Sequence, residues 1–115
     1  MFIEVDRQIV HAALANLVQN AFKYTRPRSN ISLRAHATRD RIFIDIEDEC
    51  GGLPGGDPQK LFRPFERRGS DRTGLGLGLA ISRRGVEANG GRVGVRDLPG
   101  KGCVFSIELP RAPEA

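Results

Sequence analysis

The stretch NLVQNAFK, residues 16–23, decides how the chain is organised. Asn16, Asn20 and Lys23 are spaced by four and then three residues, so in an α-helix they share one face. The opposite face carries an apolar stripe, made of Val10, Leu14, Leu17, Val18 and Ala21. Such a helix packs its stripe on a core and turns its polar row towards a cleft or solvent. We therefore predict a helix from about Asp6 to Tyr24 whose polar row can line a binding site.

Downstream of this helix, apolar and polar residues alternate at positions 31–37 and again at 42–46, on either side of a polar turn. This alternation is typical of two strands of a hairpin, each with one buried face. The pattern returns at positions 92–97 and 102–109, which predicts a second hairpin. The pairing between the two hairpins is not determined by the sequence.

The middle of the chain is rich in glycine and proline from about Glu49 to Thr73, and a loop of this length is usually functional. A second helix is predicted from about Leu75 to Ala88, because Asn-Gly-Gly at 89–91 is a helix C-terminal signal. The order of helix, two strands, loop, helix and two strands predicts an α+β fold. We expect a two-layer α/β sandwich with a mixed, mostly antiparallel sheet covered by helices.

Length and composition restrict the function further. The 115 residues fit one domain, residues 1–115, with a tail at 111–115. The net charge of +4 favours polyanionic partners, but six Phe, one Tyr and no Trp offer little for base stacking, so we expect no nucleic acid. Two cysteines suggest neither a disulfide framework nor a zinc site, which fits the cytoplasm. No apolar segment approaches the roughly 18 residues of a membrane span, so we expect no direct membrane contact, with any anchor in a parent protein.

Five segments in order resemble the motifs of sensor histidine kinases. NLVQNAFKYT (16–25) resembles the N box, DECGGLP (48–54) the first glycine box, and LFRPFER (61–67) the F box. GLGLGLAI (74–81) is similar to the second glycine box and residues 100–110 to the closing motif. The resemblance implies the Bergerat ATP-binding fold that gyrase, Hsp90, MutL and histidine kinases share.

ATP and Mg²⁺ are the ligands that this resemblance implies. Asn20 would be the metal ligand, and its amide oxygen is of the hard type that Mg²⁺ prefers. Asn16 and Lys23 would contact phosphate, and Tyr24 would pack beside the nucleotide. Each of these residues, taken alone, is more often an ordinary surface residue, so the spacing and the neighbouring motifs carry the hypothesis.

Asp48 is expected to recognise adenine. A carboxylate can accept a hydrogen bond from the exocyclic amine of adenine, where guanine has a carbonyl. An aspartate that caps a turn before glycine is the alternative interpretation. Gly51 and Gly52 would let the backbone approach the base closely. Cys50 replaces the first glycine of the usual motif, which is acceptable only if the backbone there does not need a positive φ.

The second glycine box leads into a helix N-terminus, where free amides favour phosphate. The nucleotide-binding residues expected there are Thr73, Gly74, Leu75, Gly76, Leu77 and Gly78. By resemblance, residues 59–73 include the ATP lid, and Arg67 is the arginine that we expect to reach the γ-phosphate. Arg63, Arg68 and Arg72 are the other candidates.

Five further residues have weaker signals. His11 and His36 are poor phosphoacceptor candidates, because neither has the acidic helical surroundings of one. Phe62 and Phe65 could dock the lid on the core or on a partner domain, although core packing is the favoured role of either phenylalanine alone. Gly85 lies within the second predicted helix, where glycine costs about 1 kcal/mol relative to alanine, and the sequence offers no reason for it.

Together these features predict the ATP-binding catalytic domain of a two-component sensor histidine kinase. It would deliver the γ-phosphoryl group to a histidine on a separate dimerisation domain of the same kinase, for relay to a response regulator. The isolated chain is expected to lack autokinase activity, because the acceptor histidine belongs to that other domain. Two alternatives stay open: an anti-sigma-type serine kinase, and a non-catalytic nucleotide-sensing module of the same fold.

Overall fold

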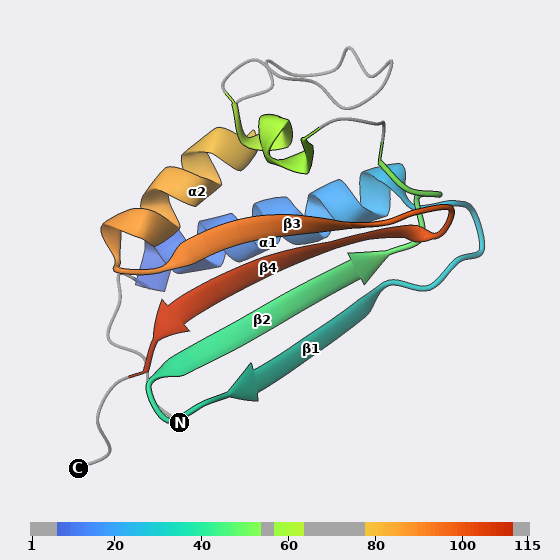
Figure 1. Cartoon of the computed structure of the whole chain (residues 1–115). Coiled ribbons are helices and arrows are strands. Elements are labelled where there is room, and N and C mark those ends of the chain that lie inside the picture. The colour runs from blue at the N-terminus through green and yellow to red at the C-terminus, as the bar shows by residue number, and fades with distance from the viewer. Residues whose placement is uncertain (1–6, 54–56, 64–77, 112–115) are drawn as a thin grey trace.

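The fold is a four-stranded sheet with two helices packed on one of its faces (Figure 1). The structure is a computed structural model that describes residues 7–53, 57–63 and 78–111. The elements in chain order are α1 (Arg7–Tyr24), β1 (Ser32–Ala37), β2 (Arg41–Asp48), the 3₁₀-helix η1 (Pro58–Phe62), α2 (Gly78–Ala88), β3 (Arg92–Leu98) and β4 (Gly102–Pro110). This arrangement confirms the predicted α+β two-layer sandwich.

Helix α1 forms where its periodicity predicts it. Leu17 and Ala21 are fully buried, and Val10, Leu14 and Val18 pack against the same core. The apolar stripe therefore faces the sheet, as expected from the i, i+3, i+4 pattern.

The strands follow the order β1-β2-β4-β3, and all three pairings are antiparallel. The β1–β2 and β3–β4 pairs are the two predicted hairpins. The central β2–β4 pairing joins the two halves of the chain and sets Asp48 opposite Cys103 and Ile46 opposite Phe105. This register brings the end of β2 beside the start of β4.

The core lies between the sheet and the helices. Phe105, Ile107 and Leu109 of β4 are fully buried, because β4 is a central strand. Phe62 of η1 is also buried and meets the Phe105 ring edge-on, with centroids 6.0 Å apart. Core packing is thus the role of Phe62. The sequence predicted only a loop here, but Asp57 caps η1 by accepting a hydrogen bond from the Gln59 backbone N–H at 3.0 Å.

The expectation that every strand has a buried face is wrong for β1. Leu33 is 54% exposed, and its strand neighbours beyond Ser32 are exposed as well. The reason is topological: β1 is the edge strand, while α1 packs on β2 and α2 on β3 (Figure 1). On this strand His36 stacks on Phe43 of β2, with ring centroids 4.8 Å apart, which agrees with a structural role.

Helix α2 ends as predicted. Gly90 has φ +80°, and the Gly91 N–H donates to the Val86 carbonyl at 3.0 Å, a pattern typical of a glycine-terminated helix. Across residues 7–53, 57–63 and 78–111, we find no helix with both the length and the apolar character needed to cross a membrane.

Candidate functional site

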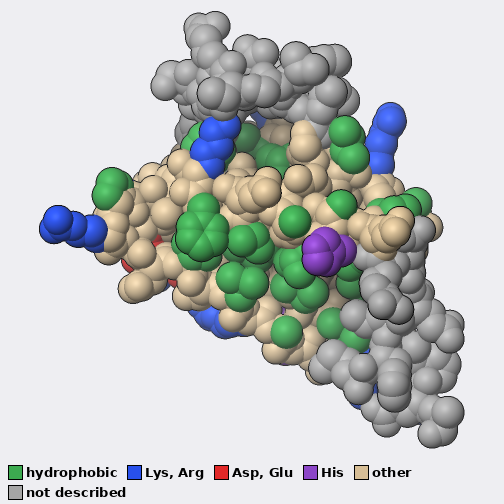
Figure 2. All heavy atoms as spheres, turned by 180° about the vertical axis from the view of Figure 1, so that it is seen from behind, with side chains coloured by type: hydrophobic (Ala, Val, Ile, Leu, Met, Phe, Trp, Pro, Cys, Tyr) green, Lys and Arg blue, Asp and Glu red, His purple; other side chains and the backbone are tan. Residues whose placement is uncertain are grey.

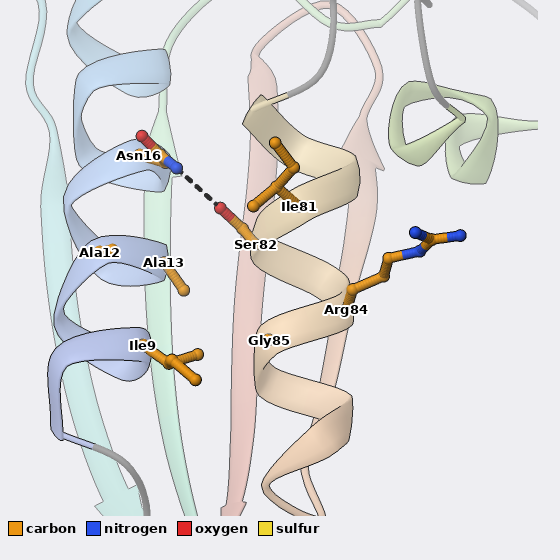
Figure 3. A pocket seen from close by; sticks show the side chains of 8 residues that line it. All are labelled: Ile9, Ala12, Ala13, Asn16, Ile81, Ser82, Arg84 and Gly85. Atoms are coloured by element: carbon orange, nitrogen blue, oxygen red, sulfur yellow. Dashed lines mark hydrogen bonds between the residues drawn. The ribbon is translucent and has the colours of Figure 1, made fainter.

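The polar row of α1 turns towards α2. Asn16 Nδ2 donates a hydrogen bond to Ser82 Oγ at 3.0 Å, and Figure 3 shows these two side chains meeting between the helices. Ser82 is buried, so the contact belongs to the packed interface between the helices. The N-box helix and the helix that follows the second glycine box therefore lie side by side.

Asn20 lies one helical turn beyond Asn16 and carries an unusual donor. Its Nδ2 atom is buried and finds no hydrogen-bond acceptor among the described residues. Leaving a buried donor unpaired costs about 1–3 kcal/mol, so such groups usually have a function or an additional partner. The same side chain offers an amide oxygen, a suitable ligand for Mg²⁺. The Asn20 side chain could therefore donate to an anion through Nδ2 and ligate a hard cation through its amide oxygen.

Lys23 and Tyr24 occupy the last turn of α1. Lys23 is exposed, and its Nζ atom lies 5.5 Å from the centroid of the half-buried Tyr24 ring. This distance is within the range of a cation–π contact. The ammonium group stays on the polar side of the helix, where an anion can reach it.

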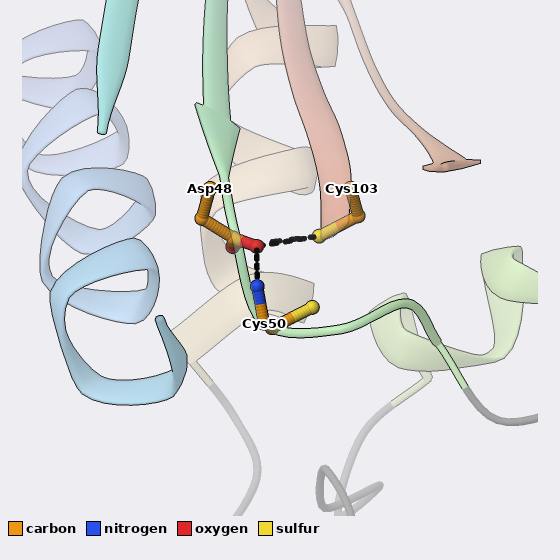
Figure 4. Close-up of side chains that lie close together, drawn as sticks. All are labelled: Asp48, Cys50 and Cys103. Atoms are coloured by element: carbon orange, nitrogen blue, oxygen red, sulfur yellow. Dashed lines mark hydrogen bonds between the residues drawn. The ribbon is translucent and has the colours of Figure 1, made fainter. Parts of the chain in front are cut away.

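Asp48 ends β2 and is fully buried. Its Oδ1 atom accepts a hydrogen bond from the Cys50 backbone N–H at 3.1 Å. The Cys103 thiol donates to the same carboxylate, with Sγ 3.4 Å from Oδ2 and 3.5 Å from Oδ1 (Figure 4). These donors offset the cost of burying a carboxylate. The β2–β4 register places Cys103 there.

The glycine loop after Asp48 is held between two distant segments. Gly51 and Gly52 have φ values of +98° and +103°, which glycine adopts without strain. An added Cβ at Gly51 would lie 2.7 Å from Arg26 Nη2, and one at Gly52 would lie 3.0 Å from the Gly100 nitrogen. The positive φ disfavours a side chain at both positions, and at Gly52 the Gly100 backbone also limits the space.

Cys50 fits its glycine position. Among the described residues other than glycine, Arg28 is the one with a positive φ, so Cys50 has an ordinary backbone conformation. Its Sγ atom lies 3.7 Å from the Gly52 carbonyl oxygen. Cysteine can therefore replace the first glycine of the motif, because the backbone at position 50 does not need a positive φ.

Several predicted site residues lie outside the described part of the chain. These are Arg67, Thr73, Gly74, Leu75, Gly76 and Leu77, together with Phe65, Arg68 and Arg72 of the lid region. Gly78 begins α2 and is exposed. Arg63 follows η1 and is exposed as well.

An open groove of about 500 Å³ runs along the contact between α1 and α2. Its lining is mainly apolar and consists of Ile9, Ala12, Ala13, Asn16, Ile81, Ser82, Arg84 and Gly85. Figure 2 shows apolar side chains gathered on this helical face, and Ile81 is 61% exposed. Gly85 now has a structural reason: an added Cβ would lie 2.5 Å from Ile9 Cγ2 (Figure 3). Glycine thus allows the two helices to pack closely.

Sequence reasoning missed three contributors to these sites. Ser82 binds Asn16, Cys103 binds Asp48, and Asp97 Oδ1 accepts a hydrogen bond from the Leu53 N–H at 2.8 Å. Their partners lie 66, 55 and 44 residues away. Of these three residues, only Cys103 lies within a segment that the sequence had marked as a motif, the closing motif at residues 100–110.

Comparisons with known proteins agree with this geometry. The structure is similar to the mycobacterial sensor histidine kinase MprB, with a TM-score of 0.83, 28% identity, and coverage of 97% of this chain and 78% of that one. It is also similar to the catalytic domain of the histidine kinase ThkA, with a TM-score of 0.83, 29% identity, and coverage of 95% and 70%. Both solved proteins are histidine kinases, and their similarity to this chain is in sequence as well as in fold.

Sequence relatives are sensor proteins too. The chain is 40% identical over 111 residues to the sensor protein KdpD of Mycobacterium tuberculosis, covering 95% of this chain and 13% of that protein. It is 32% identical over 120 residues to the sensor histidine kinase WalK of Bacillus subtilis, covering 99% and 20%. The chain thus spans about a fifth or less of the length of these two relatives.

A family model covers almost the whole sequence. It describes the histidine kinase-, DNA gyrase B- and HSP90-like ATPases and matches residues 5–113. The match includes α1, the glycine loop after Asp48 and all four strands, and it supports nucleotide binding. The chain belongs to this ATPase family.

Proposed function

We propose that this chain is the ATP-binding catalytic domain of a two-component sensor histidine kinase. It directs the γ-phosphoryl group of ATP to a histidine on a separate dimerisation domain of the same kinase, and a response regulator then receives that group. The family match and the sensor-kinase relatives support this proposal. They favour it over the serine-kinase alternative. A cytoplasmic location, with any membrane anchor elsewhere in the parent protein, is part of the proposal.

One observation carries the proposal: the buried Nδ2 donor of Asn20 has no acceptor in the described part of the chain. This donor lies on the same helix as Asn16, which is fixed to α2 by Ser82. An oxygen-rich anion bound beside this face of α1 would supply the missing acceptor. A triphosphate is such an anion.

The residues of the chain bind and orient the nucleotide. Bound ATP supplies the transferable phosphoryl group, and Mg²⁺ neutralises part of its charge. In the proposed site Asn20 holds the metal, Asn16 and Lys23 contact phosphate, and Tyr24 packs beside the nucleotide. Asp48 accepts the hydrogen bond from the adenine amine. Gly52, the segment Thr73–Gly78 and Arg67 of the lid complete the proposed set.

Catalysis in this scheme consists of positioning. Phosphoryl transfer requires the protein mainly to align the reacting groups and to neutralise the charge on the phosphates. The amide, ammonium and guanidinium groups named above provide both. The acceptor histidine and the groups around it belong to the dimerisation domain, so the chain alone should bind ATP without sustained turnover.

Calorimetry with ATP, ADP and GTP, each with and without Mg²⁺, tests nucleotide binding. We expect ATP to bind more tightly than GTP, and Mg²⁺ to strengthen ATP binding. Gln19→Ala is a suitable control, because Gln19 is an exposed neighbour on α1. Equal affinity for ATP and GTP, or affinity independent of Mg²⁺, would contradict the assigned roles.

Phosphotransfer is tested by adding the dimerisation domain of the parent kinase and labelled ATP. We expect label on histidine, which acid removes and base does not. Label on serine would support the serine-kinase alternative instead. ATP binding without any transfer would support a nucleotide-sensing module.

A further inference from the structure

Two thiols and a carboxylate converge at the end of the central strand pair. The Sγ atoms of Cys50 and Cys103 and a carboxylate oxygen of Asp48 all lie within 4.8 Å of one another (Figure 4). Cys103 and Asp48 are fully buried, whereas Cys50 is half-buried on the loop. The proposed nucleotide site uses the carboxylate but neither thiol.

This donor set suits a thiophilic cation. Thiolates with a carboxylate bind Zn²⁺ well, while Mg²⁺ prefers a set made of oxygen atoms. With Zn–S bonds of about 2.3 Å and tetrahedral angles, the two sulfurs would stand about 3.8 Å apart. The two sulfurs would therefore need to close by about 1 Å at most, and a sulfur and the carboxylate oxygen by roughly 1.3 Å at most.

The required movement falls on the loop. Asp48 and Cys103 are paired in the β2–β4 ladder, so their positions are fixed by the sheet. Cys50 follows β2 and belongs to the loop that contains Gly51 and Gly52. Because Cys50 is also the least buried of the three, a cation would enter on its side.

We propose that Cys50, Cys103 and Asp48 form a binding site for a thiophilic divalent cation of the Zn²⁺ type. The two thiols lose their protons to solvent, two metal–sulfur bonds and one metal–oxygen bond form, and water completes the coordination. No oxidation state changes. Sequence reasoning argued against zinc because two cysteines supply too few ligands, but the strand register adds a carboxylate as the third.

The same site would oppose nucleotide binding. This second step rests on the proposed function, in which Asp48 accepts a hydrogen bond from adenine. A cation bound to this carboxylate would neutralise its charge and occupy the space beside it, so the carboxylate would be a weaker and less accessible acceptor for the adenine amine. Bound cation and bound ATP should therefore exclude each other.

Titration of the reduced 115-residue chain with Co²⁺ tests the metal site. We expect thiolate-to-cobalt charge-transfer absorption together with the d–d bands of a tetrahedral ion, both removed by adding Zn²⁺. Cys50→Ser and Cys103→Ser should each weaken metal binding by at least about tenfold, since changes even beyond the direct ligands cost about 10–100-fold.

Absence of thiolate bands, or unchanged affinity in Cys50→Ser, would overturn the proposal. Cys50→Ser is the decisive variant, because Cys103 is fully buried and its replacement also disturbs the core. Circular dichroism establishes that each variant is folded.

The competition is measured as ATP affinity at a free Zn²⁺ concentration fixed by a metal buffer, since ATP itself binds divalent cations. At a free concentration about 100 times the Zn²⁺ dissociation constant, ATP should bind about 100-fold more weakly. In Cys50→Ser, whose Zn²⁺ affinity should be at least about tenfold lower, the same Zn²⁺ should weaken ATP binding by about tenfold at most. Independent binding of Zn²⁺ and ATP would refute the exclusion. Failure to bind ATP without zinc would refute the proposed function instead, and the cobalt spectrum would still decide the metal site.

Discussion

The polar row of α1 and the carboxylate at the end of β2 differ in how many of their hydrogen bonds the protein itself supplies. Asn20 has a buried donor with no acceptor among the described residues. Asp48 accepts hydrogen bonds from the Cys50 N–H and the Cys103 thiol. Among the described residues, the helix side therefore keeps one buried donor without an acceptor, whereas the sheet side supplies two donors to its carboxylate. Substitutions on the two sides should change stability in opposite directions.

Asp48→Ala should have the largest effect. It leaves the Cys50 N–H without its acceptor, which costs about 1–3 kcal/mol of unfolding free energy. Loss of a charged hydrogen bond to adenine, about 1.5–3 kcal/mol, should weaken ATP binding about 10- to 150-fold. Urea unfolding and calorimetry measure the two quantities.

A matched control for this change is Asp45→Ala on the same strand, where the carboxylate accepts a hydrogen bond from Ser106 Oγ at 2.7 Å. It should lower stability without changing ATP affinity. If Asp48→Ala retains full ATP affinity, Asp48 does not recognise the base.

Asn20→Ala should separate binding from stability. Removal of an unpaired buried donor, together with the higher helix propensity of alanine, should leave the unfolding free energy unchanged or raise it by up to about 1 kcal/mol. Mg²⁺-dependent ATP affinity should fall at least about tenfold, the loss of one hydrogen bond to a charged group. Gln19→Ala controls for the change in propensity. A clear loss of stability in Asn20→Ala would show that the donor already has a partner.

Gly85→Ala tests whether the helices are held closely together without ligand. The added Cβ would lie 2.5 Å from Ile9 Cγ2, and overpacking of this kind costs about 1–3 kcal/mol. Alanine gains about 1 kcal/mol from helix propensity, so the net loss should be up to about 2 kcal/mol. In an Ile9→Ala background the same change should stabilise the protein. Destabilisation of equal size in both backgrounds would exclude this contact as the cause.

Ser82→Ala should have the smallest effect. Loss of the bond from Asn16 Nδ2 to Ser82 Oγ should lower the unfolding free energy by about 0.5–1.5 kcal/mol. A double-mutant cycle with Asn16→Ala isolates this interaction. Additive effects in the cycle would mean that the two side chains do not stabilise each other.

Local patterns predicted the local structure well. The period of the apolar stripe defined α1, and alternation with short turns defined both hairpins. Leu33 is an exception. The alternation of residues predicts that successive side chains point to opposite faces of the strand, but it does not predict whether helices cover one of these faces. Leu33 is exposed because β1 is the edge strand of the sheet.

The candidate site could be outlined only where its residues are near in sequence. Asn16, Asn20 and Lys23 lie on one helix, so their spacing made them candidates. The thiol beside Asp48 and the hydroxyl beside Asn16 come from β4 and α2, and long-range pairing cannot be read from one sequence. The reason for Gly85 was hidden likewise, because it depends on Ile9 of the other helix.

The β2–β4 register has a consequence for folding. Asp48 and Cys103 are 55 residues apart in sequence, and neither hairpin contains both. Contacts of such separation require the closure of a long loop, which makes them slow to form. The adenine site that we propose can therefore form only after the two halves of the chain have associated. A ligand held there stabilises that association and gains nothing from either half alone, so protection of β2 and β4 against hydrogen exchange should rise together when it binds.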